Sequence, residues 1–95
     1  MPMQPILKSA ERAIEAVEHW KPLVNAPAGT QAYTGQAEGW TFQVVAFPIE
    51  DQGFPPGSRG FDGTGTITLG GRGTLLRLTR PLAEKAVKLA EAQAS

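Results

Sequence analysis

The spacing of hydrophobic residues changes twice along this chain of 95 residues, and this change limits its possible folds more than any other feature. Near both ends, hydrophobic residues recur every three to four positions, which is the period of an amphipathic α-helix. In the middle they alternate with polar residues, which is the period of a β-strand with one buried side. Helical ends around a strand-forming centre are typical of the α+β class.

The first helix is predicted over residues 5–21 and the second over residues 81–94. Pro5 suits a first helical turn, and Pro22 disfavours helical geometry in the residue before it, so both ends of the first helix have a physical cause. The second helix begins at a proline as well. Its predicted buried stripe consists largely of alanine and is formed by Leu82, Ala86, Leu89 and Ala90.

Four strands are predicted between the helices, over residues 30–36, 40–47, 64–69 and 74–79. Glycine-rich turns at residues 35–39 and 70–73 join neighbouring strands, which favours antiparallel pairing. In the strongest strand, one side forms the better core face with Trp40, Phe42, Val44 and Ala46. We therefore expect one domain over residues 1–95, with an antiparallel sheet of three to four strands flanked by the terminal helices. In this α-β-β-β-β-α two-layer sandwich, the helices cover one face of the sheet.

Residues 48–62 hold three prolines and three glycines, so regular structure is not expected there. Connections of this length are uncommon in compact domains and are often binding loops or self-packed loops. Phe54 and Phe61 would expose large hydrophobic surface if the segment moved freely. We therefore predict that the loop packs on these two rings. The alternative is an exposed recognition element.

Hydrophobic residues also occur on the side of the sheet that faces away from the expected core, where Val45, Phe47 and Leu75 lie. Monomers seldom leave a large hydrophobic patch in water. The sequence thus predicts a homodimer that also binds a further protein. The partner-binding residues that we expect are Val45, Phe47, Phe54 and Phe61. The alternative is that the long loop folds back over this side of the sheet within one chain.

The charge is unevenly distributed although the net charge is zero. Residues 1–58 carry three cations against six anions, and residues 59–95 carry six cations against three anions. Cations in the second part could neutralise phosphates, so a small nucleic-acid-binding protein is the alternative function. The residues that would serve it are Arg72, Arg77, Arg80, Lys85 and Lys88.

Catalytic and metal-binding chemistry has little support in this sequence. Cysteine is absent, and the single imidazole, His19, falls on the exposed side of the first helix without a recognisable catalytic partner. Glu50, Asp51 and Asp62 lack the alternate spacing of a calcium loop. The glycine clusters at residues 60–65 and 70–73 each lead into a strand, whereas a phosphate-binding loop requires a glycine cluster that opens a helix. We expect a cytoplasmic protein that is not an enzyme, with no metal, no cofactor and no membrane-spanning segment.

Overall fold

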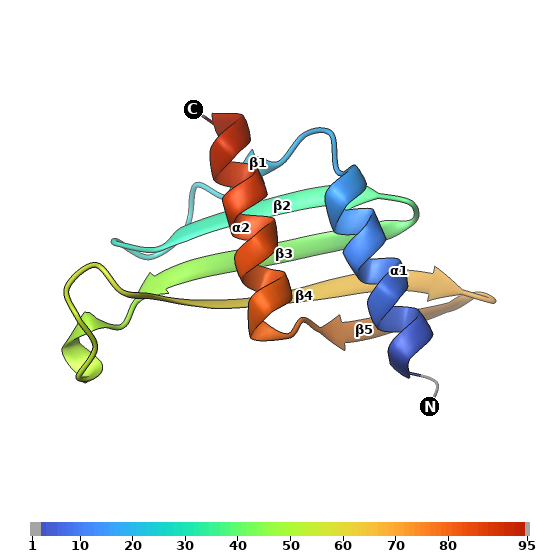
Figure 1. The fold of residues 1–95 in the computed structure, drawn as a ribbon. Helices are drawn as coiled ribbons and strands as arrows, with labels where there is room; N and C mark the ends of the chain where they lie inside the picture. The colour runs from blue at the N-terminus through green and yellow to red at the C-terminus, as the bar shows by residue number, and fades with distance from the viewer. Residues whose placement is uncertain (1–2, 95) are drawn as a thin grey trace.

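The computed structural model describes residues 3–94 and has two layers, with both helices lying side by side on one face of a single sheet (Figure 1). In chain order the elements are α1 (Met3–Ala16), β1 (Lys21–Pro22), β2 (Gln31–Ala37), β3 (Trp40–Pro48), the 3₁₀ turn η1 (Glu50–Gln52), β4 (Arg59–Leu69), β5 (Arg72–Arg77) and α2 (Arg80–Ala94). The five strands follow the order β1-β2-β3-β4-β5, and every neighbouring pair is antiparallel. The predicted fold class is confirmed.

The strand count of three to four was too low, because β1 is a strand of only two residues. Because β1 takes up Lys21, the first helix is also shorter than predicted and ends at Ala16. The backbone N–H of Trp20 donates to Oε1 of Gln93 in α2 at 2.8 Å, so a tertiary contact replaces a helical hydrogen bond at this point. Lys21 then pairs with Thr34 of β2. Hydrophobic period alone could not reveal this exit from the helix.

The two long hairpins turn more tightly than the sequence suggested. The β2-β3 turn consists of Glu38 and Gly39, and the β4-β5 turn of Gly70 and Gly71, with a positive φ at all four residues. Two central residues with positive φ define the type I′ turn, whose twist matches that of the flanking strands. β5 accordingly begins at Arg72, two residues before the predicted start.

The segment without regular structure is also shorter than predicted, because β4 begins at Arg59. The remaining loop is closed by hydrogen bonds: Ile49 N–H donates to the Ser58 carbonyl at 3.2 Å, and Gly57 N–H donates to Oε2 of Glu50 at 2.7 Å. Loop packing is confirmed for Phe61, a partly buried β4 residue in contact with the core. It is wrong for Phe54, which is 51% exposed.

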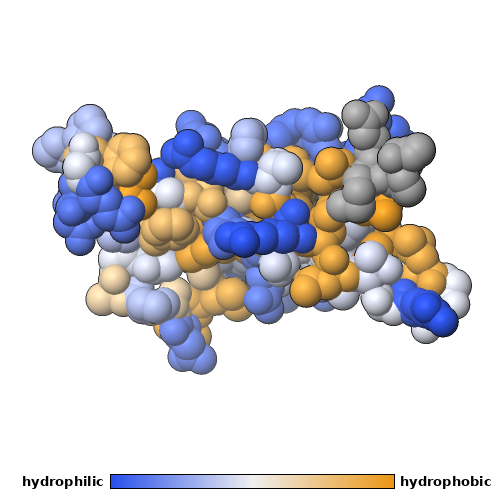
Figure 2. Space-filling model, turned by 90° about the horizontal axis from the view of Figure 1, so that it is seen from below, coloured by the Kyte–Doolittle hydropathy of each residue, from blue (hydrophilic) through white to orange (hydrophobic). Residues whose placement is uncertain are grey.

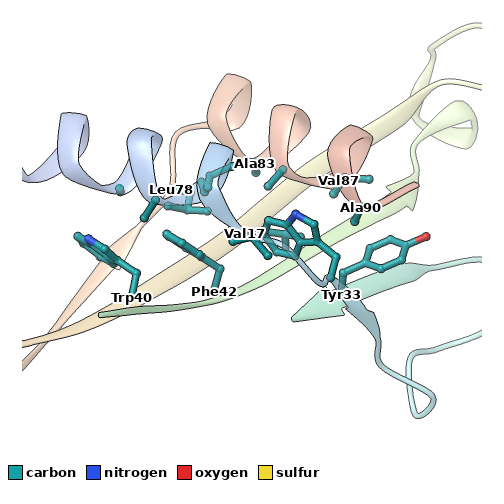
Figure 3. Packing of buried hydrophobic residues seen from close by; sticks show 14 of the residues in the cluster. Val17, Tyr33, Trp40, Phe42, Leu78, Ala83, Val87 and Ala90 are labelled. Carbon is teal, nitrogen blue, oxygen red and sulfur yellow. The ribbon is translucent and has the colours of Figure 1, made fainter. Parts of the chain in front are cut away.

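The core lies between the helices and the sheet, and its centre is aromatic (Figure 3). The rings of Trp40 and Phe42 stack with centroids 5.6 Å apart. The predicted core face of β3 is confirmed, since all four of its residues are buried. The stripe predicted for α2 was rotated: the buried residues are Ala83, Ala86, Val87 and Ala90, whereas Leu89 is exposed.

Glycines on the helix-facing side of the sheet let these rings approach the backbone. A Cβ atom placed on Gly35 would lie 2.7 Å from Cε3 of Trp20, and one on Gly65 would lie 2.9 Å from Cε1 of Phe42. Real Cβ atoms essentially never come that close. The glycines of β2 and β4 therefore belong to the packing of the core.

Ion pairs join the elements at the rim of the core. Lys85 of α2 contacts both Glu11 and Glu15 of α1, and hydrogen bonding to Glu15 raises the pKa of the lysine. Arg59 of β4 binds Glu91 of α2 through two hydrogen bonds, of 2.6 and 3.2 Å. Neither described helix is long and apolar enough to cross a membrane.

Candidate functional site

The face of the sheet opposite α1 and α2, called the outer face below, carries neither of the two described helices (Figure 1). Strand register assigns its residues, because alternate residues of a strand point to opposite faces. They are Ala32, Thr34 and Gln36 of β2, Thr41, Gln43, Val45 and Phe47 of β3, Gly60, Asp62, Thr64, Thr66 and Thr68 of β4, and Gly73, Leu75 and Arg77 of β5. The outer face thus combines a row of threonines with a few hydrophobic residues.

The hydrophobic residues gather on β2 and β3. Val45 lies directly opposite Ala32 in the register. Leu23, just after β1, joins them because its N–H donates to the Ala32 carbonyl at 2.9 Å, and its side chain is 37% exposed. Phe47 lies over Gly60, where an added Cβ would come within 2.5 Å of the ring. Leu23, Ala32 and Val45 make one border of a shallow hollow, and Phe47 lies outside it.

The hollow has a volume of about 270 Å³. Leu23, Ala32 and Val45 line its hydrophobic border, and its polar border is formed by Gln43, Asp62, Thr64 and Arg77. One side therefore offers hydrophobic contact and the other offers hydrogen-bond donors and acceptors. This combination orients a bound side chain and its neighbouring polar groups.

The charged part of this border is an ion pair. Nη2 of Arg77 lies 3.1 Å from Oδ2 of Asp62, and the carboxylate also accepts the N–H of Gly63 at 2.8 Å. The hydrogen bond from Arg77, followed by that from Gly63, lowers the pKa of Asp62. Asp62 is therefore ionised at neutral pH, and it can only accept further hydrogen bonds.

The predicted partner-binding residues do not form one surface. Val45 and Phe47 lie on the outer face, as predicted. Phe61 lies on the opposite face, where the guanidinium of Arg59 stacks on its ring at 5.2 Å. Phe54 and Phe61 line a separate hollow of about 320 Å³ beside α2. The loop therefore turns Phe54 toward the helix layer, and the alternative in which the loop covers the outer face has support only at Gly60, where Ile49 lies beside Phe47.

The five basic residues of the alternative function are also dispersed. Arg77 pairs with Asp62, Lys85 with the two α1 glutamates, and Lys88 with Glu84 at 3.1 Å. Arg72 lies at the start of β5 and Arg80 at the start of α2, and neither forms an ion pair with another residue of the described part of the chain. Most of the expected cations are therefore neutralised locally.

His19 is exposed, as predicted from the sequence. It lines a hollow of about 530 Å³ together with Glu18, Lys21 of β1 and Glu38 of the β2-β3 turn. This hollow is wide and its ionisable side chains are all exposed. Within residues 3–94, no three histidines, cysteines or carboxylates are placed to hold a metal ion.

No family model, no curated protein and no solved structure matches this chain. The indications of function therefore come from the geometry of the described residues. That geometry adds Leu23, Ala32, Gln43 and Thr64 to the candidate residues. Sequence reasoning missed Leu23 because it follows a strand too short to leave a pattern, whereas the alternating Thr64, Thr66 and Thr68 could have identified an exposed strand face.

Proposed function

We propose that this chain is a non-enzymatic interaction protein of the cytoplasm that binds another protein with the outer face of its sheet. The partner inserts one large hydrophobic side chain into the hollow, against Leu23, Ala32 and Val45. Its neighbouring amide groups hydrogen-bond to Gln43 and Thr64. The observation that carries the proposal is the hollow itself, with one hydrophobic and one polar border on the sheet face that carries neither described helix.

The composition of this face fits a protein ligand. The centre of a protein interface is typically depleted in unpaired charges and provides a pocket for an anchoring side chain. The two charged residues that line the hollow within residues 3–94, Asp62 and Arg77, neutralise each other. The threonines around it supply hydroxyls that serve as donors and acceptors without a charge to desolvate.

Nucleic-acid binding, the alternative, has less support from the geometry. Three of its five candidate cations are already ion-paired, and the hollow lined by Phe54 and Phe61 includes two of the five, Arg80 and Lys88. Binding to a labelled single-stranded oligonucleotide at low salt, weakening as salt rises, would support this alternative. Undetectable binding at low salt would remove it.

The experiment for protein binding begins with selection of peptides from a displayed random library on the immobilised protein. The leading peptide is then titrated against the wild type and two variants with the same chemical change. Gln43→Lys places a cation at the hollow, and Gln52→Lys places one in η1, at a similarly exposed position. We expect Gln43→Lys to weaken binding about tenfold or more, which corresponds to about 1.4 kcal/mol.

Gln52→Lys should leave the affinity unchanged, and both variants should keep the thermal midpoint of the wild type. Selected peptides should share a hydrophobic anchor residue. A peptide that binds both variants as tightly as the wild type would show that the outer face is not the binding surface. Equal weakening in both variants would point to a general charge effect and contradict the proposal equally.

A further inference from the structure

The two edges of the sheet differ in how well they are protected against further strand pairing. At one edge, β1 has only two residues, Lys21 and Pro22. A short strand, a lysine and a proline are common devices that prevent a further strand from adding. At the other edge, β5 runs for six residues, from Arg72 to Arg77, without a proline. Only this second edge offers an uninterrupted row of backbone groups.

The ladder between β4 and β5 determines which of these groups point outward. The N–H of Leu78 donates to the carbonyl of Gly63 at 2.9 Å. In an antiparallel ladder, residues bonded to the neighbouring strand alternate with residues whose N–H and C=O face away from it. Counting back from Leu78 by this alternation, the backbone groups of Gly73, Leu75 and Arg77 face away from β4.

We propose that β5 pairs with β5 of a second copy of this chain, in antiparallel orientation, with Leu75 opposite the partner's Leu75. This inference goes beyond the proposed function and does not depend on it. The two sheets then join into one continuous sheet of ten strands. Because each copy contributes the same edge, every hydrogen bond on one side of the two-fold axis is repeated on the other side.

This register fits the side chains as well as the backbone. It places Gly73 opposite the partner's Arg77, so a residue without a side chain faces a long one. Arg77 is already paired with Asp62 in its own chain, which limits repulsion between the copies. Leu75 is 70% exposed in one copy, and at the two-fold axis each Leu75 covers the other. An exposed leucine in the middle of an open edge thus finds a hydrophobic neighbour.

The helix layer extends the contact on the other face of the sheet. The N-terminal ends of α1 and α2 both reach the β5 side of the molecule (Figure 1). Figure 2 looks onto this side and shows separate hydrophobic areas divided by hydrophilic residues. A second copy would cover such areas from both layers. A lone peptide strand would contact the backbone without the helices, which is why a second copy is the better occupant.

The first test measures the mass of the protein by light scattering over a range of concentrations. We expect a dimer of the 10.1 kDa chain. Leu75→Lys should raise the dimer dissociation constant about tenfold or more, because it places two charges at the two-fold axis. Leu69→Lys is the matched control: Leu69 is also an exposed leucine, at 51%, but it belongs to β4 and should leave the constant unchanged. A monomer at the highest soluble concentration would overturn the proposal.

The second test is specific to the register and uses the absence of cysteine from the chain. Residues opposite each other in a bonded antiparallel pair have Cα atoms about 5.5 Å apart, which is within disulfide range. Leu75→Cys should therefore form a covalent dimer under mild oxidation. Arg72→Cys should not, because in this register Cys residues at position 72 lie about 20 Å apart, six strand positions from each other. Dimers that form equally from both variants, or from Arg72→Cys alone, would refute this register.

Discussion

Replacing Gly35 with alanine tests whether the sheet depends on glycine for its contact with the aromatic core. The added Cβ would lie 2.7 Å from Cε3 of Trp20 and 2.8 Å from Cγ1 of Val17, and both side chains are buried. Overpacking of this kind usually costs about 1 to 3 kcal/mol. Alanine also restricts the unfolded chain, which returns about 0.4 to 1 kcal/mol. We therefore expect a net loss of about 1 to 2 kcal/mol.

Gly73→Ala is the matched control, because Gly73 is also a strand glycine without a positive φ, and a Cβ there would meet nothing within 4 Å. The same entropic gain should raise its stability slightly. For a domain of this size, 1 kcal/mol corresponds to about 4 to 8 °C in the thermal midpoint. Midpoints from circular dichroism should fall for Gly35→Ala and not for Gly73→Ala, when the proteins are compared at a concentration at which light scattering finds only monomers, so that the proposed contact at Gly73 plays no part. A midpoint for Gly35→Ala at or above that of the wild type would refute the packing argument.

Two further pairs of variants, and one variant measured at two pH values, test other parts of the fold. Trp40→Phe should destabilise the protein by about 1 kcal/mol more than Trp20→Phe. The reason is that the Trp40 indole N–H donates to Oγ of Ser9 in α1 at 3.0 Å, whereas the buried indole nitrogen of Trp20 has no partner in residues 3–94. Equal losses of unfolding free energy in urea would contradict this prediction. Phe61→Ala should cost about 1 to 3 kcal/mol, below the 3 to 5 kcal/mol typical of a fully buried ring. Phe54→Ala should cost less than about 1 kcal/mol, because its ring is half exposed; similar melting curves for the two variants would contradict this. Glu91→Gln should lower the midpoint at pH 7 by more than at pH 3. Hydrogen bonding to its arginine partner lowers the pKa of Glu91 from its ordinary 4.5, so the pair contributes stability above that pH and loses it as the pH falls through the lowered value. If the midpoints of the wild type and Glu91→Gln differ by the same amount at both pH values, the ion pair is not the source of the difference.

The sequence predicted most of the architecture because the strongest patterns were also local ones. Trp40, Phe42, Val44 and Ala46 stand at alternate positions of one strand, and the paired glycines at residues 70 and 71 supply the positive φ that a tight hairpin requires. The errors arose where a tertiary contact decides the outcome. A side chain 73 positions away, Gln93, takes the hydrogen bond that would have continued α1. No spacing rule within the first helix contains that information.

The candidate site was harder to predict for the same reason. Val45 and Phe47 follow from alternation within one strand, whereas Leu23 reaches the outer face through a two-residue strand. Phe54 and Phe61 were grouped with them because they are aromatic and close in sequence. In the structure, the alternation of residues along β4 places Phe61 on the helix side, so one strand position separates a core residue from a candidate binding residue.

The outer face and the β5 edge, the two proposed binding surfaces, share residues. Leu75 and Arg77 belong to the outer face through their side chains and to the β5 edge through their backbone groups. Antiparallel pairing of two β5 strands requires a two-fold axis perpendicular to the sheet, and such an axis keeps both outer faces on the same side. A dimer would therefore present two copies of the hollow on one continuous surface, with the helices of both copies behind it. A partner with two anchoring side chains would bind such a surface more tightly than either hollow alone, because the second contact forms within the complex.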